Sequence, residues 1–297
     1  MAGAARYLDP AIVARLGTID LKVRAIVEGF LTGLHRSPYK GFSVEFAEYR
    51  QYLPGDDLGT LDWKIYARSD RYFVKKFEEE TNLTCHLLMD VSASMGYGSH
   101  GITKLEYGSY LAGALAYLMN RQRDAFGLIA FDEAIVSRLP ASARSGHLRA
   151  TLVALERLTL GSRTNVAKPL HDLAVAIRRR GLVVLISDLL DDSDRVIEEL
   201  KHFRHQGTDV IVFHVLDPNE LTFPFDQAAR FRDPETADEV LAVPAAARAD
   251  YLDRMQALIA TYKRELGLAG IDYCLLDTSK PLELGLMSYL MTRRRVL

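Results

Sequence analysis

The chain has 297 residues, with 37 basic and 39 acidic side chains and therefore a formal net charge of −2. This balance argues against a general nucleic-acid binder, which would carry a marked basic excess. With 48% hydrophobic and 26% charged residues, the composition is that of an ordinary globular protein, and the length suits one large domain or two modest ones.

The first 83 residues are predicted to form a small α+β appendage. Apolar side chains recur at helical spacing over residues 10–34. Residues 42–46 and 71–77 alternate as β-strands do, and Pro54-Gly55 marks a turn between them.

No N-terminal segment is apolar enough to cross a membrane. The most apolar window, residues 11–34, contains three basic and two acidic side chains, whereas a membrane helix needs about 20 mainly apolar residues. The start of the chain also lacks the basic and then apolar regions of a secretory signal. We therefore expect a cytoplasmic protein without a membrane span.

Residues 84–297 are predicted to form a doubly wound α/β domain, with a mostly parallel six-stranded sheet and helices on both faces. Short apolar runs alternate there with longer segments of helical period, which is typical of this class. The second and third strands lie too close together for a crossover helix, so we expect them to form an antiparallel hairpin at one edge. The predicted strands are 85–89, 126–131, 135–139, 182–186, 210–216 and 271–276.

Residues 217–243 interrupt this pattern and are predicted to form a hairpin insertion. The segment contains three prolines, and a Pro-Glu-Thr-Ala turn is flanked by Arg230-Phe-Arg and Val240-Leu-Ala-Val. We expect the insertion to belong to the α/β domain.

Oxygen-bearing side chains follow three of the predicted segments. Asp90, Ser92 and Ser94 form an Asp-x-Ser-x-Ser run directly after the first strand, Thr164 lies in a loop between two helices, and Asp188 follows the strand at 182–186. Such residues before a helix are more often caps and turn formers. Because the carboxyl ends of parallel strands meet at one edge of a sheet, however, we expect these five side chains to lie together.

This set of side chains favours a hard metal ion. Two carboxylates and three hydroxyls supply only oxygen ligands, which suit Mg²⁺ better than Ca²⁺, with Mn²⁺ as the alternative. The absence of Cys and His from the three segments disfavours zinc. Two negative charges balance a dication while the neutral hydroxyls leave it able to accept a further carboxylate, so the pattern indicates a binding site.

The same five positions resemble the metal-ion-dependent adhesion site of von Willebrand factor A domains, in the right order along the chain. The resemblance covers residues 84–297 and implies the Rossmann-like fold of that family. It further implies that Ser92 and Ser94 bind the metal directly, that Thr164 does so directly or through water, and that Asp90 and Asp188 act mostly through water. The open sixth position would take an Asp or Glu of a partner protein.

Motifs upstream of this domain resemble the signature of a bacterial family known as domain of unknown function fifty-eight, and Lys104-Leu-Glu-Tyr further supports it. Members often accompany MoxR-type AAA+ ATPases, which implies an adaptor or chaperone-like role with such an ATPase or its client. The motifs are Tyr49-Arg-Gln-Tyr-Leu-Pro-Gly-Asp-Asp57, Asp62-Trp63-Lys64, Ala67-Arg68 and Phe77-Glu-Glu-Glu80.

Two motifs invite enzymatic interpretations. Gly96, Gly98 and Gly101 match the G-x-G-x-x-G pattern of dinucleotide sites, but the first glycine does not directly follow the strand, so we interpret the segment as a loop beside the metal. A cluster of aspartates at 188, 191, 192 and 194 would suit a two-metal phosphatase or nuclease. We instead expect Asp188 at the site and the others to cap the helix at 195–205, because no catalytic base is evident.

The remaining candidates are histidines and arginines. His202 and His205 share a helical face but lack a third ligand, so we expect both to be solvated. The arginine run at 178–180 is interpreted as a helix C-terminus, and the run at 293–295 leaves open a nucleic-acid adaptor. The sequence thus favours a non-enzymatic, Mg²⁺-dependent protein-binding module, with a metal-dependent hydrolase and a nucleic-acid adaptor as alternatives.

Overall fold

The structure is a computed structural model that describes residues 10–14, 17–36, 49–51, 73–75, 83–161, 166–177, 181–227, 229–232 and 238–296. The chain divides into two compact units, Met1–Phe30 together with Leu83–Leu297, and Leu31–Asn82. In the smaller unit β1 (Tyr49–Gln51) pairs antiparallel with β2 (Phe73–Lys75). The predicted strand at 42–46 and the Pro54-Gly55 turn lie outside the described residues.

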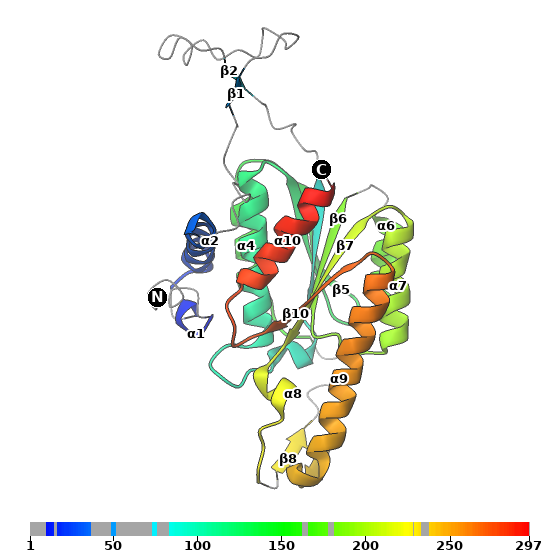
Figure 1. The fold of residues 1–297 in the computed structure, drawn as a ribbon. Helices are drawn as coiled ribbons and strands as arrows, with labels where there is room; N and C mark the ends of the chain where they lie inside the picture. The colour runs from blue at the N-terminus through cyan, green and yellow to red at the C-terminus, as the bar shows by residue number, and fades with distance from the viewer. Residues whose placement is uncertain are drawn as a thin grey trace. The chain divides into compact units, whose positions relative to one another are not determined.

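A six-stranded sheet forms the centre of the larger unit (Figure 1). Its order is β10-β7-β6-β3-β4-β5, and every neighbouring pair is parallel except β4 and β5. The predicted fold class and the antiparallel edge hairpin are therefore confirmed. The strands are β3 (Thr84–Asp90), β4 (Ala125–Phe131), β5 (Ile135–Ser142), β6 (Leu182–Ser187), β7 (Asp209–Leu216) and β10 (Asp272–Asp277).

The central strands are apolar along their whole length because helices cover both of their faces. All six residues of β6 are buried, as are all but the first of β7. Edge strand β5 instead leaves most of its side chains exposed.

One face of the sheet is covered by α6 (Ala167–Ala176), α7 (Ser193–His205) and α9 (Pro244–Leu268), which share a buried apolar cluster with β6 and β7. The other face is covered by α4 (Lys104–Arg121) and α10 (Glu283–Val296) (Figure 1). Helix α4 lies close to the strands at Gly108, where an added Cβ would stand 2.7 Å from Met89 Cε. Helix α5 (His147–Glu156) packs against α4.

The N-terminal helices belong to the same unit as the sheet. Helix α1 (Pro10–Val13) and the part of α2 (Ile19–Arg36) up to Phe30 lie in this unit, and Val23 of α2 packs against Gly113 of α4, where an added Cβ would lie 2.6 Å from Val23 Cγ2. The apolar stripe of Val23, Ile26, Val27 and Phe30 is buried. We expected residues 1–83 to form a separate appendage, whereas residues 1–30 lie in the same unit as the sheet, where this stripe is buried.

Short elements complete the larger unit. The 3-10 helix η3 (Ala93–Gly96) follows β3, and α8 (Pro218–Thr222) follows β7. Strands β8 (Ala229–Arg232) and β9 (Glu239–Ala242) then pair antiparallel, forming the hairpin that precedes α9. Among the described residues, every helix is too short or too polar to cross a membrane.

Candidate metal centre

Asp90, the last residue of β3, is buried and held from two sides. Its Oδ1 accepts a hydrogen bond from Ser92 N at 2.9 Å, and its Oδ2 accepts one from Ser187 Oγ at 2.6 Å. The parallel register of β3 and β6, in which Met89 lies opposite Ile186, brings these strand ends side by side. The sheet itself therefore fixes the Asp90 carboxylate at its carboxyl edge.

The two serines of the motif lie beside this carboxylate. Both are buried, and their Oγ atoms are 3.1 Å apart. Two cis ligands of an octahedral Mg²⁺ with bonds of 2.0–2.1 Å stand about 2.9 Å apart. The separation of Ser92 Oγ and Ser94 Oγ thus fits direct coordination of one such ion.

Asp188 joins this group from the end of β6. Its carboxylate is buried and accepts a hydrogen bond from the Ser94 hydroxyl. The next residue, Leu189, has a left-handed backbone with φ +53°, which is costly for a branched side chain. This sharp turn directly follows Asp188 at the carboxyl edge of the sheet.

The fifth predicted ligand, Thr164, lies outside the described residues. Hydrogen bonds place both ends of its loop at the site: Gly161 N donates to Val91 O at 2.7 Å, and Val166 N donates to Asp191 Oδ2 at 2.7 Å. Among the described residues, the structure brings together the other four predicted ligands, which are Asp90, Ser92, Ser94 and Asp188.

Lys104 is a site residue that the sequence prediction did not include. This first residue of α4 is fully buried, and its Nζ donates to Asp188 Oδ2 and to Glu220 Oε1, each at 2.7 Å. The helix dipole disfavours a positive charge in the first turn of a helix. A lysine at the first position of α4 therefore indicated that a nearby carboxylate compensates the charge of that lysine. Glu220, on α8, is 116 positions away in the sequence, so no local pattern indicates the pair.

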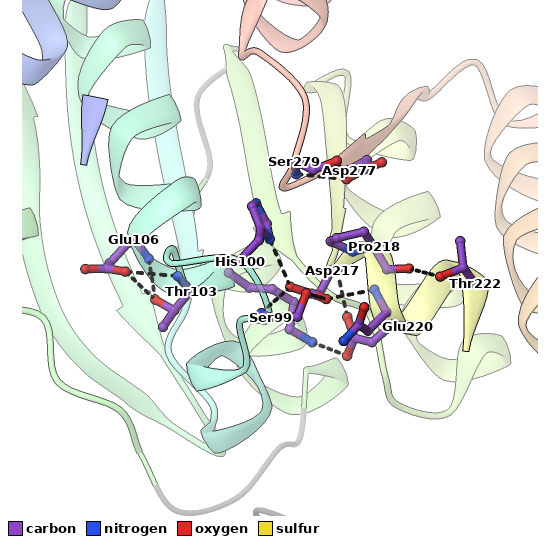
Figure 2. A network of polar contacts seen from close by, with 12 residues as sticks. Ser99, His100, Thr103, Glu106, Asp217, Pro218, Glu220, Thr222, Asp277 and Ser279 are labelled. Atoms are coloured by element: carbon purple, nitrogen blue, oxygen red, sulfur yellow. Dashed lines mark hydrogen bonds and ion pairs between the residues drawn. The ribbon is translucent and has the colours of Figure 1, made fainter. Parts of the chain in front are cut away.

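A second set of contacts joins the loop before α4 to α8 (Figure 2). Ser99 donates to both oxygens of Asp217, from its backbone N at 2.8 Å and from Oγ at 2.6 Å, and His100 Nδ1 lies 3.6 Å from Asp217 Oδ2. Asp217 N donates to Glu220 Oε2 in a capping box at the start of α8. These bonds fix the position of Glu220 opposite Lys104.

The charges of the site suit a divalent cation. Burial, together with the nearby Asp188, raises the pKa of Asp90 to about 7. Burial alone would raise the pKa of Asp188, but Lys104 lowers it below its usual value. With all four groups ionised, Asp90, Asp188 and Glu220 carry three negative charges and Lys104 one positive charge, so 1 − 3 = −2 remains. A dication would balance this charge, and the donor set accordingly fits Mg²⁺.

The glycine motif has a packing role. A Cβ at Gly98 would lie 2.2 Å from the carbonyl oxygen of Ile102, and one at Gly96 would lie 2.5 Å from Leu160 Cδ1. The backbone contact requires glycine at Gly98 without any nucleotide, whereas the neighbour of Gly96 is a side-chain methyl group that can shift.

The aspartates after Asp188 divide between two helices. Asp192 caps α7, accepting from the backbone N of Asp194 and Arg195, as expected. The expectation for Asp191 was wrong, because its carboxylate accepts from Val166 N at the start of α6 instead.

His202 and His205 are both open to solvent, as expected, with the His202 side chain 40% exposed. We did not predict, however, the residues that lie beside His202. His171 of α6 and Glu199 of α7 lie beside it, a proximity that depends on the packing of two helices and has no local sequence signal. The run at 178–180 and the side chains of 293–295 lie outside what the structure describes.

Comparisons with known proteins found relatives in sequence and solved structures with a similar chain path. Uncharacterised proteins of Mycobacterium bovis and Mycobacterium tuberculosis are 27% identical over 293 residues, covering 97% of this chain and 91% of each relative. The crystal structure of the conserved hypothetical protein BatB from Bacteroides thetaiotaomicron matches 72% of this chain and 100% of its own, with a TM-score of 0.50 and 15% identity. The VWA domain of SpRpn10 matches 46% of this chain and 76% of its own, with a TM-score of 0.35 and 15% identity. The likeness to BatB, at 15% identity, concerns the fold alone.

The family described as "Protein of unknown function DUF58" matches residues 48–259.

Proposed function

Because this chain belongs to the DUF58 family, whose function is unknown, we propose a function from its own site: a non-enzymatic, Mg²⁺-dependent module that binds an acidic side chain of a partner protein. The observation that carries the proposal is the arrangement of Ser92 Oγ and Ser94 Oγ, 3.1 Å apart, beside Asp90 and Asp188 at the carboxyl edge of the sheet. Mn²⁺ would suit the same ligands.

In this proposal the protein residues prepare an electrophilic binding site. Ser92 and Ser94 present neutral hydroxyls, while Asp90 and Asp188 supply negative charge from positions fixed by the sheet. The bound ion would provide one Lewis-acidic position for a carboxylate. Lys104 takes up part of the charge of Asp188, which leaves the ion more dependent on an external carboxylate.

The same contacts favour binding over hydrolysis. General-base catalysis needs a side chain that is free to take a proton near neutral pH. Lys104 is held by two carboxylates, which, despite its burial, raise its pKa above the usual value. The buried imidazole of His214 has a pKa lowered to about 4 by burial, and its Nδ1 is hydrogen-bonded to Tyr273 Oη. Neither group is suited to activate water, and Asp90, whose pKa is raised to about 7, has both carboxylate oxygens occupied by hydrogen bonds from Ser92 N and Ser187 Oγ.

The partner we propose is a MoxR-type AAA+ ATPase or its client protein, presenting an Asp or Glu in the cytoplasm. The choice of ATPase rests on the resemblance of the upstream motifs to a family whose members often accompany such ATPases, whereas the acidic character of the partner rests on the chemistry of the site. The chain would then act as an adaptor or chaperone-like component.

The test is affinity capture of partner proteins from the source cells, with 5 mM Mg²⁺ and with EDTA. Wild type and a Ser137→Ala control, altered on exposed strand β5, should retain a protein in Mg²⁺ that Asp90→Ala and EDTA both release. Identical capture by Asp90→Ala would contradict the proposal. EDTA-sensitive hydrolysis of phosphoesters by the pure chain would favour the hydrolase instead.

A further inference from the structure

A second cluster of metal-ligating side chains lies on the surface of α6 and α7. His171 of α6, together with Glu199 and His202 of α7, brings three ligand atoms within 4.8 Å of one another. His171 Nδ1 lies 3.0 Å from Glu199 Oε2, and His202 Nδ1 lies 3.9 Å from the same oxygen. The two imidazole rings are tilted by 46° with their centroids 6.1 Å apart.

These distances fit a tetrahedral ion after small side-chain adjustments. With metal–ligand bonds of 2.0–2.1 Å, tetrahedral ligands stand about 3.3 Å apart, between the two separations observed. Two imidazole nitrogens and one carboxylate oxygen form a donor set that suits Zn²⁺ and its neighbours in the first transition row, and not Mg²⁺.

The backbones that carry these ligands are fixed by the protein core. Leu170 and Leu173 of α6, and Leu200 and Phe203 of α7, are buried in one apolar cluster. The ligands lie on the outer side of this helix pair, with side chains 55% exposed for His171, 20% for Glu199 and 40% for His202. An ion can therefore reach a preformed site directly from solvent.

His202 also has the outer contact that metal-binding histidines usually have. Its second ring nitrogen, Nε2, lies 3.0 Å from Gln206 Nε2. Rotation of the Gln206 amide by 180° would present its oxygen to the Nε2 proton and leave Nδ1 free for a metal. Such outer-shell contacts orient the ring and strengthen the ligand.

We propose that His171, Glu199 and His202 form a transition-metal site, with Zn²⁺ as its preferred ion, that clamps α6 to α7. Three protein ligands leave a fourth position for water. The clamp joins the two helices that follow the loops of Thr164 and Asp188, and the bond from Val166 N to Asp191 already joins their N-terminal ends. This site is separate from the hard-cation site in both place and ligand chemistry.

The test uses the full chain without a polyhistidine tag, stripped with EDTA and titrated with Zn²⁺ by calorimetry and with Co²⁺ by absorption spectroscopy. We expect one saturable equivalent, a Co²⁺ d–d spectrum of tetrahedral type, and a rise of about 5 °C in melting temperature at 100-fold excess over Kd. Excess Mg²⁺ should not displace the ion, and Ser94→Ala should bind it normally.

Ligand variants distinguish this site from adventitious surface binding. His171→Ala and His202→Ala should each weaken Zn²⁺ binding by more than about 100-fold, and Gln206→Ala by about 10-fold. The matched control is His205→Ala, which removes an exposed histidine of the same helix and should bind like wild type. Undiminished binding by His171→Ala, an equal loss in His205→Ala, or the absence of saturable binding at micromolar Zn²⁺ would overturn the proposal.

Discussion

Replacing Lys104 with methionine keeps the side-chain length but removes an ammonium that lies 2.7 Å from both Asp188 Oδ2 and Glu220 Oε1. Lys104 and Asp188 are fully buried, and the Glu220 side chain is 15% exposed. The variant therefore leaves buried negative charge without its partner. Removing one member of a buried ion pair typically costs about 3–5 kcal/mol.

This cost should be visible in thermal unfolding. At about 3 °C per kcal/mol for a chain of this size, Lys104→Met should lower the melting temperature by about 9–15 °C in EDTA at pH 7.5, measured by circular dichroism. The matched control, Lys263→Met, alters an exposed lysine of α9 and should change stability by less than about 0.5 kcal/mol.

The variant should also respond more strongly to metal than the wild type does. Without Lys104, the site carries a charge of −3 when Asp90, Asp188 and Glu220 are ionised, so Mg²⁺ should recover part of the lost stability. Glu220→Gln in the Lys104→Met background should recover part of it without metal, because it removes one unpaired carboxylate. A loss below about 1 kcal/mol in Lys104→Met would refute the role of the buried ion pair. If Mg²⁺ stabilised Lys104→Met and the wild type equally, the idea that Lys104 and the metal ion both neutralise Asp188 would be refuted.

Three further predictions concern the fold around the site. The pKa of His214 is lowered to about 4 by burial, so its contribution to stability is present above pH 6.5 and is lost as the pH falls towards 4. That loss is at most about 3 kcal/mol, and urea unfolding of His214→Asn should show a flatter pH dependence over this range; an unchanged slope would contradict the assignment. Gly108→Ala would place a Cβ 2.7 Å from Met89 Cε and should cost about 1–3 kcal/mol in urea unfolding, whereas wild-type stability would show that α4 can move off the sheet. Asp192→Ala removes the N-cap of α7 and should cost about 1 kcal/mol, with Asp194→Ala as the control; equal losses in the two variants would show that the cap bonds are not the cause.

The sheet could be predicted from the sequence because parallel strands covered on both faces must be apolar throughout. The run 182–186 corresponds to β6 (Leu182–Ser187), and the run 210–216 corresponds to β7 (Asp209–Leu216). The short link between β4 and β5 left an antiparallel hairpin as the available connection. Strand β5 extends three residues beyond its predicted end, to Ser142, because pairing with β4 continues past the apolar part.

The convergence of Asp90 and Asp188 could be predicted for a related reason. Each follows a parallel strand, and the ends of adjacent parallel strands meet at one edge. The Asp-x-Ser-x-Ser spacing then brings Ser92 back towards Asp90, because Asp90 Oδ1 accepts from Ser92 N. The spacing of the Asp-x-Ser-x-Ser run and the position of each aspartate at a strand end were therefore sufficient to predict this part of the site.

The parts that sequence reasoning missed depend on contacts between distant helices. Lys104 meets Glu220 because α4 and α8 lie at the same sheet edge, and His171 meets Glu199 because α6 packs against α7. Hydrophobic periodicity indicates which face of a helix is buried, but it does not indicate which polar side chains of two helices become neighbours. A lysine at the first position of α4 was the one local anomaly that pointed to such a contact.

Titration with Mn²⁺, followed by electron paramagnetic resonance of the free ion and competed with Mg²⁺, tests most directly whether Asp90, Ser92, Ser94 and Asp188 form a hard-cation site. Wild type and the Ser137→Ala control should bind one ion that Mg²⁺ displaces, and His171→Ala, which lacks the proposed transition-metal site, should bind this ion equally well. Ser94→Ala removes a direct ligand and should bind at least about 10-fold more weakly. Equal affinity in Ser94→Ala and wild type, or no saturable binding by wild type, would contradict the account.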